Sequence, residues 1–242
     1  MKTLTFLAIT IFSGAVAGTI LAILNLVIVE PYIDRAIALE NQRKISSGEK
    51  IDLVAISGYR VWQKGGAIFA GAVYGISLSA LFGIVFAYGR HTLPSDSNKK
   101  KAIFLAGVLW FVLYLMVAIK YPANPPAVGD PQTIYSRQSL FVAYLATSGF
   151  TVLALALLWN RFQNNKSKRI ILPLIYAAVM TVAYIGFPPN PDKITISMEL
   201  IQTFRFWTAM TIGLFWGILA IIFGSLWDKF IPREQPKIAT RY

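Results

Sequence analysis

The sequence predicts an all-α integral membrane protein with six transmembrane helices, and three observations carry this prediction. Hydrophobic residues make up 56% of the 242 residues and charged residues only 14%, whereas a soluble domain carries roughly 25% charged residues. Six apolar runs each approach or exceed the ~20 residues that a helix needs to cross a bilayer. The basic residues lie mainly in short connections between these runs, which is the pattern typical of membrane proteins.

The first two spans, near residues 4–29 and 65–87, each carry small residues at a four-residue spacing. Small side chains at this spacing line one face of a helix and let two backbones approach closely. We therefore expect these faces to pack within the chain, with a dimer interface as the alternative. The positions are Gly14, Gly18 and Ala22 in the first span and Ala67, Gly71, Gly75, Ser79 and Gly83 in the second.

The remaining four spans are predicted near residues 102–119, 139–159, 170–187 and 204–227. The third and fifth of the six are the shortest. The fifth contains Pro173, which we expect in the first turn of its helix, where proline is tolerated. These spans place residues 1–231 in one six-helix transmembrane domain, followed by a basic cytoplasmic tail at 232–242.

The charge distribution predicts the orientation of the helices. With six spans both termini lie on one side, where 13 basic residues accompany 3 acidic ones, against 10 basic and 8 acidic residues on the other side. Connections rich in Lys and Arg stay in the cytoplasm, so we expect a multi-pass protein of the cell membrane with both termini cytoplasmic. The net charge of +12 is then a sign of membrane orientation, and we expect no nucleic-acid partner.

The connections predicted to face outward, at residues 30–64, 120–138 and 188–203, contain most of the prolines. The second begins Lys120-Tyr-Pro-Ala-Asn-Pro-Pro-Ala-Val-Gly-Asp-Pro131, with four prolines in twelve residues. Such a segment cannot form a helix, because each proline lacks an N–H and fixes φ. Since lipid does not tolerate unpaired backbone groups, we expect a stiff connector at a membrane surface or inside protein.

The outer connections also suggest three related helical hairpins. Tyr121-Pro-Ala-Asn-Pro125 ends the third span, Phe187-Pro-Pro-Asn-Pro191 ends the fifth, and Glu30-Pro31 ends the first. An arginine precedes each even-numbered span, at positions 60, 137 and 205. The alternative is that proline and arginine simply suit helix ends at an interface.

Two long motifs carry a resemblance to a known family. The segment from Lys120 to Pro131, together with Val29-Glu-Pro-Tyr-Ile-Asp-Arg-Ala-Ile-Ala-Leu-Glu40, resembles the CbtA family of probable cobalt transporter subunits. The resemblance implies a membrane subunit of a cobalt uptake system that works with a small, histidine-bearing, single-span subunit similar to the family's CbtB. The candidate binding or structural residues are Lys120, Tyr121, Pro122, Asn124, Pro125, Asp130, Arg60, Arg137 and Arg205.

Donors for a metal ion are scarce in this sequence. There is no cysteine and one histidine, His91, on the predicted cytoplasmic side, whereas cobalt favours imidazole or thiolate. If Pro31 starts a helix, Glu30 and Asp34 lie one turn apart with Asn41 on the same face, and we take these two carboxylates as the candidate metal ligands. The alternative is that Glu30, Asp34 and Asp130 pair with the three arginines. We expect no cofactor beyond a transported or weakly bound divalent cation.

Enzyme motifs are absent from the sequence: there is no His–carboxylate pair, Gly-rich phosphate loop or nucleophile motif. The predicted spans are nearly free of charge, which argues against a pump or channel formed by this chain alone. Two functions remain open. One is a membrane subunit of a metal uptake system, and the other is a structural or accessory subunit of a larger membrane complex.

Overall fold

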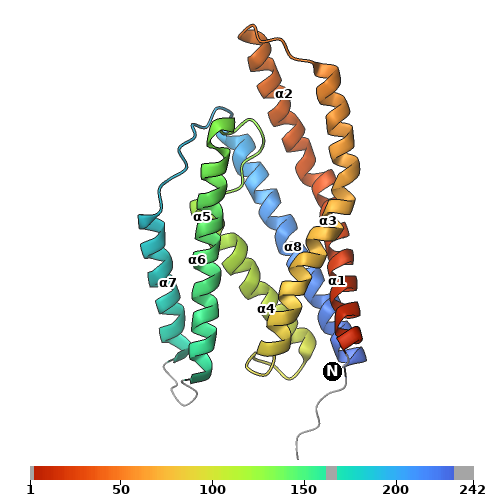
Figure 1. The fold of residues 1–242 in the computed structure, drawn as a ribbon, viewed down its shortest axis with the longest axis vertical. Coiled ribbons are helices and arrows are strands. Elements are labelled where there is room, and N and C mark those ends of the chain that lie inside the picture. The colour runs from red at the N-terminus through yellow and green to blue at the C-terminus, as the bar shows by residue number, and fades with distance from the viewer. Residues whose placement is uncertain (1–2, 162–167, 232–242) are drawn as a thin grey trace, which may run out of the picture.

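The computed structural model of the protein describes residues 3–161 and 168–231, so the predicted tail at 232–242 lies outside the described residues. The described residues form helices and connections, without a strand, and the continuous helical stretches α1–α2, α3, α4–α5, α6, α7 and α8 alternate in direction along the long axis (Figure 1). Three short elements, η1 to η3, interrupt or precede the α-helices; η1 and η2 are π-helical and η3 is a 3₁₀ turn. The elements are α1 Thr3–Leu24, η1 Asn25–Val29, α2 Glu30–Ser46, α3 Leu53–Gly89, α4 Asn98–Trp110, η2 Phe111–Leu115, α5 Met116–Lys120, η3 Pro131–Thr133, α6 Ile134–Arg161, α7 Lys168–Gly186 and α8 Met198–Phe230.

Five helical stretches of the described chain are long and apolar enough to cross a membrane: Thr3–Ser46, Leu53–Gly89, Asn98–Lys120, Pro131–Leu158 and Met198–Phe230. A sixth apolar helix, Ile170–Gly186, is shorter. At 1.5 Å per residue it measures about 26 Å, slightly less than the ~30 Å hydrocarbon core of a bilayer. Five of the six predicted spans therefore meet the length requirement, and the fifth span in the chain is present as a shorter helix.

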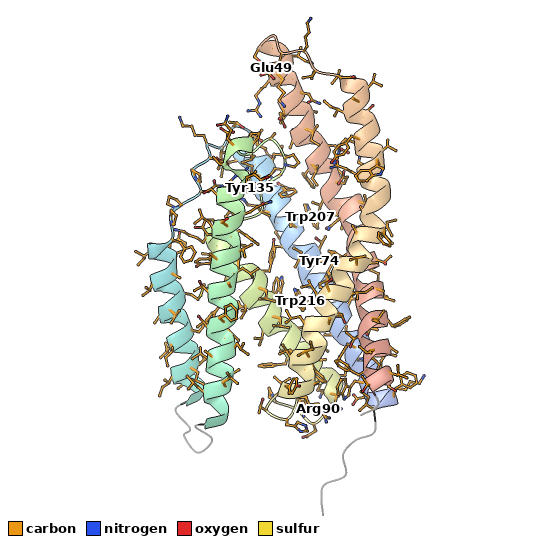
Figure 2. The ribbon with its side chains drawn as sticks, in the orientation of Figure 1. Glu49, Tyr74, Arg90, Tyr135, Trp207 and Trp216 are labelled. Carbon is orange, nitrogen blue, oxygen red and sulfur yellow. The ribbon has the colours of Figure 1, made fainter. Side chains whose placement is uncertain are left out.

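Most of the connection predicted at 30–64 is helical. Pro31 does not end the first helix. Helix α1 runs through the π-helical η1 directly into α2, where the N–H of Glu30 bonds the carbonyl of Asn25. A π turn changes the hydrogen-bond register just before the proline, whose missing N–H and bulky ring would otherwise disrupt a regular α-helix. Figure 2 shows the result, a two-helix arm with Glu49 at its tip that extends past the start of α6 at Tyr135.

The first turn of α7 also differs from its prediction. The helix begins at Lys168, so Pro173 lies in its second turn instead of its first. The N–H that proline lacks would have bonded the carbonyl four residues earlier, which is still close to the start of the helix. One missing bond at this position leaves the rest of α7 regular.

The small-residue faces of α1 and α3 pack against each other, which confirms the prediction of packing within the chain. A Cβ atom added at Gly14 would lie 2.6 Å from the Gly75 carbonyl oxygen and 2.7 Å from the Ile76 Cα. At this separation the hydroxyl of Ser79 donates a hydrogen bond of 2.8 Å to the Thr10 carbonyl oxygen. Close backbone approach therefore brings dispersion contacts and a buried interhelical hydrogen bond together.

The buried side chains form two clusters. The larger joins α1, α3, α4 and α8, and its centre is the aromatic group Phe82, Phe86, Phe223 and Trp227. The smaller joins η2, α5, α6 and α7, and Leu113 packs against both clusters. Helix α7 packs mainly on α6, whereas α8 packs on α1 and α4, so α7 and α8 do not form a packed hairpin like that of α1 and α3 (Figure 1).

The π-helical segment η2 is accompanied by polar contacts at depth. In η2 the carbonyl of Val112 accepts a hydrogen bond of 2.7 Å from Ser148, whose hydroxyl also lies 2.8 Å from the hydroxyl of Tyr176. This buried group links η2, α6 and α7. It satisfies three polar groups that would otherwise be costly inside a membrane.

Candidate functional site

The predicted site residues gather at one end of the helices, which we call the proline-rich end. It consists of segments 121–130 and 187–197 together with the neighbouring ends of α2, α3, α6 and α8. Arg90 marks the opposite end in Figure 2. His91, the one histidine, follows α3 at that opposite end. It therefore lies far from the predicted metal ligands Glu30 and Asp34 along the long axis of the molecule.

The first group at the proline-rich end is a charge cluster between α2 and α3. Glu30 and Asp34 lie one turn apart on α2, as the spacing predicted. The Arg60 guanidinium pairs with Glu30 and, at 3.1 Å, with Asp34. Lys64 adds a 2.7 Å contact to Asp34, and Gln63 accepts a bond of 2.7 Å from Arg60. Two acids and two bases neutralise each other here. Glu30 and Asp34 are therefore ion-paired, as the alternative interpretation of the sequence expected.

The second group holds the start of α6 against segment 187–197. Arg137 Nε lies 2.8 Å from Asp192 Oδ2, and Arg137 Nη2 donates to the Asp130 carbonyl oxygen at 3.1 Å. The Asp192 side chain is only 4% exposed, and it also accepts from Thr133 at 2.8 Å. The carboxylate that neutralises Arg137 is thus Asp192, and the predicted partner Asp130 contributes its backbone oxygen.

Asp130 has a different task from the predicted ion pair. Its side chain accepts the N–H of Gln132 at 2.8 Å and so caps the short η3 helix. The preceding residue, Gly129, has a φ of 119°, and a Cβ atom there would lie 2.6 Å from Arg137 Nη1. Only glycine meets both the backbone and the space requirement at this position, which explains the Gly-Asp-Pro end of the motif.

The third group joins the proline-rich segment to α8. Arg205 Nε donates to the Ala123 carbonyl oxygen at 3.2 Å, and Nη2 donates to Asn124 Oδ1 at 2.7 Å. Arg205 thus bonds one backbone and one side-chain oxygen of the proline-rich segment. In the described residues Arg205 has no carboxylate partner, unlike the other two arginines of the site.

The proline-rich segment is also tied to the segment that follows α7. Tyr121 donates from its hydroxyl to the Pro188 carbonyl oxygen at 2.6 Å, and burial raises the pKa of this Tyr121 hydroxyl, which keeps it protonated as a donor. Lys120 Nζ bonds the Tyr184 carbonyl oxygen at 2.8 Å and lies 4.6 Å from the Tyr184 ring centre. Pro125 is fully buried, so the segment is both anchored and packed.

An open cavity of about 870 Å³ lies beside this segment, with Pro122, Pro125, Arg137 and Asn190 among its lining residues. Its walls offer backbone carbonyls, amides, one arginine and the carboxylate of Glu40. No group of three or more His, Cys, Asp or Glu side chains that could hold a metal ion occurs in the described ranges 3–161 and 168–231. The site is therefore a set of ion pairs and carbonyl contacts that holds the N-terminal parts of α3, α6 and α8 in place.

Sequence reasoning placed most of these residues together but missed three of their partners. Asp192, Thr133 and Pro188 complete the contacts of Arg137 and Tyr121. A signal existed for one of them, because the Phe187-Pro-Pro-Asn-Pro191 echo is followed directly by an acidic residue.

The fold and the site together define a class. Apolar helices alternate in direction, small residues close their interfaces, and the charged residues of the site lie at helix ends, so the chain is a multi-pass helical membrane protein.

Comparison with protein families gives the particular group. The chain belongs to the CbtA family, described as probable cobalt transporter subunit, which matches residues 3–228, and this match confirms the resemblance carried by the two motifs. Neither the comparison with curated proteins nor that with solved structures finds a match.

Proposed function

We propose that the protein is the membrane-embedded subunit of a cobalt or similar divalent metal uptake system, and that it acts with a small single-span partner subunit that provides the metal donors. The observation that carries the proposal is the charge cluster of α2 and α3, in which Arg60 and Lys64 already neutralise Glu30 and Asp34. A transporter subunit whose own carboxylates are paired in this way needs ligands from another chain.

The chemistry of cobalt supports this division of labour. Borderline metals prefer imidazole and thiolate, and carboxylate and carbonyl oxygens compete poorly for them. This chain has no thiolate, and His91 lies at the opposite end from the charge cluster. A metal ion would first meet the partner's ligands. It would then meet Glu30 and Asp34, and the segment from Tyr121 to Asp130, once the paired bases give way.

The proposal includes six crossings with both termini in the cytoplasm. The alternating directions of the spans support six crossings, and the apolar part of α7, Ile170–Gly186, at about 26 Å can cross a locally thinner bilayer. The native chain has no cysteine, so single cysteines are unambiguous probes. In intact cells Ser46→Cys on α2 should react with a membrane-impermeant thiol reagent. Ser97→Cys before α4 should react only after the membrane is opened, and the reverse pattern contradicts the orientation.

Calorimetry with cobalt on the purified chain, with and without its partner, tests the division of labour. We expect no stoichiometric sub-micromolar binding by the chain alone. Metal uptake by cells should require both subunits. Sub-micromolar binding by the single chain, lost in Glu30→Gln or Asp34→Asn, would mean that the carboxylates are primary ligands and that the proposed role of the partner is wrong.

A second function is favoured by the same pairing. Ion pairs that lock helix ends, combined with spans nearly free of charge, also suit a structural or accessory subunit of a larger membrane complex. Absence of metal binding and uptake even in the presence of the partner would support this alternative.

A further inference from the structure

The three arginines of the proline-rich end occupy comparable positions but differ in how their charge is neutralised. Arg60 pairs with two carboxylates and Arg137 with the buried carboxylate of Asp192. Arg205 bonds only the Ala123 carbonyl oxygen and the Asn124 amide oxygen among the described residues. A partly buried guanidinium normally has an anion beside it, because neutral acceptors leave its charge uncompensated.

Arg205 also has donors to spare. A guanidinium presents five N–H groups in a planar fork, and the two bonds to residues 123 and 124 use Nε and Nη2. The Nη1 group has no hydrogen-bond acceptor among the described residues. The planar fork suits carboxylate and phosphate oxygens, so the unused edge of Arg205 is shaped for an anion.

A cavity of about 380 Å³ lies beside this arginine, between η2 and α5 on one side and α8 on the other, and Arg205, Gln202 and Tyr114 carry the polar side chains of its lining. The rest of its wall includes Leu115, Ile119 and Phe206. Ile119 is 61% exposed and Phe206 is 56% exposed, on helices that are long and apolar enough to cross a membrane. The cavity therefore combines a cationic, hydrogen-bonding end with an apolar wall that faces lipid.

We propose that this cavity binds an anionic phospholipid, with its phosphate against Arg205 and Gln202 and an acyl chain along Ile119 and Phe206. Charge complementarity identifies the headgroup, and the exposed apolar wall identifies the tail. A basic pocket between membrane helices is a recognised place for an acidic headgroup. The bound phosphate gives Arg205 the anion that Asp192 gives Arg137. By holding the Arg205 guanidinium in place, the phosphate also keeps Asn124, and with it the proline-rich segment, against α8.

The test measures lipid retention on the purified chain by native mass spectrometry, with phosphatidylglycerol and phosphatidylcholine supplied at equal concentration. We expect the native chain to retain phosphatidylglycerol about tenfold more than phosphatidylcholine, which corresponds to about 1.4 kcal/mol, because the choline cation of phosphatidylcholine offsets the charge that its phosphate presents to Arg205. Arg205→Gln should lose this preference. Arg35→Gln is the control and should keep it, because Arg35 is an exposed arginine of α2 that does not line this cavity.

A second variant keeps the test decisive if Arg205→Gln fails to fold. Ala209→Trp fills the same cavity without removing the arginine, and it should reduce phosphatidylglycerol retention by a similar factor. Three results would overturn the proposal: equal retention of the two lipids by the native chain, an unchanged preference in both cavity variants, or displacement of the lipid by millimolar inorganic phosphate alone. Loss of the lipid on adding a partner subunit would identify a protein carboxylate as the anion instead.

Discussion

The contact between α1 and α3 offers the sharpest test of the fold, through the substitution Gly14→Ala. The added methyl group would lie 2.6 Å from the Gly75 carbonyl oxygen and 2.7 Å from the Ile76 Cα. Ordinary contact begins at 3.4 Å, so the two helices must move apart by about 0.8 Å. These two neighbours are backbone atoms, and the third is the Ser79 Cβ at 2.6 Å, which is attached directly to the backbone; none of them can turn away as the end of a flexible side chain could.

The magnitude follows from two opposing effects. Replacing glycine by alanine inside a helix stabilises it by about 1 kcal/mol. Against this, forcing an extra methyl group into a packed interface costs about 1–3 kcal/mol, and a gap of 0.5–1 Å forfeits about a quarter to a half of each dispersion contact along the face. We therefore expect Gly14→Ala to be destabilising in spite of its better helix propensity.

Gly217→Ala in α8 is the matched control, because nothing lies within 4 Å of a Cβ atom built there. It should leave stability unchanged or raise it by up to about 1 kcal/mol. Thermal unfolding of both purified variants in the same detergent should then separate their melting temperatures by on the order of 5–10 °C. If Gly14→Ala melts with or above Gly217→Ala, α1 and α3 do not pack at the described separation.

Three further predictions concern polar contacts, each read by thermal unfolding. Ser148→Ala should cost about 0.6–1.7 kcal/mol, and a double-mutant cycle with Tyr176→Phe should give a coupling, whereas strictly additive losses would contradict their contact. Asp192→Asn should lower the free energy of unfolding by about 1–3 kcal/mol, because it leaves Arg137 without its carboxylate. An unchanged stability would rule out this ion pair. Tyr121→Phe should cost about 0.5–1.5 kcal/mol and speed hydrogen exchange in residues 187–197, and unchanged exchange would show that the hydroxyl does not anchor that segment.

The sequence was sufficient to locate the helices, but it did not reveal where the first helix ends or where the second begins. Apolar runs locate the membrane-crossing part of each helix, because burial in lipid requires them. The polar continuation through α2 carries no such signal, and Glu30-Pro31 has the composition of a helix end. The π-helical segment at Asn25–Val29 changes that outcome, and its effect on the bonding register is not visible in hydropathy.

The site shows the same division between local and distant information. The cluster of Glu30 and Asp34 could be predicted because four residues make one turn of a helix. The pairing of Arg137 with Asp192 could not, because it depends on α7 packing against α6 and on the path of segment 187–197. Sequence alone offered Asp130 as the nearer acid, and its place before Pro131 instead makes it a helix cap.

The position of α8 has a consequence for how the protein is made. Helix α8 is the last to be synthesised, yet it contributes Phe215, Trp216, Phe223 and Trp227 to the larger buried cluster, between α1 and α4. Because synthesis proceeds from the N-terminus, α1, α3 and α4 must wait in the bilayer without their central partner, while α6 and α7 can already pair. The membrane-inserted chain therefore passes through a stage in which the larger buried cluster of α1, α3 and α4 lacks the side chains of α8 and exposes its alanine and aromatic side chains to lipid.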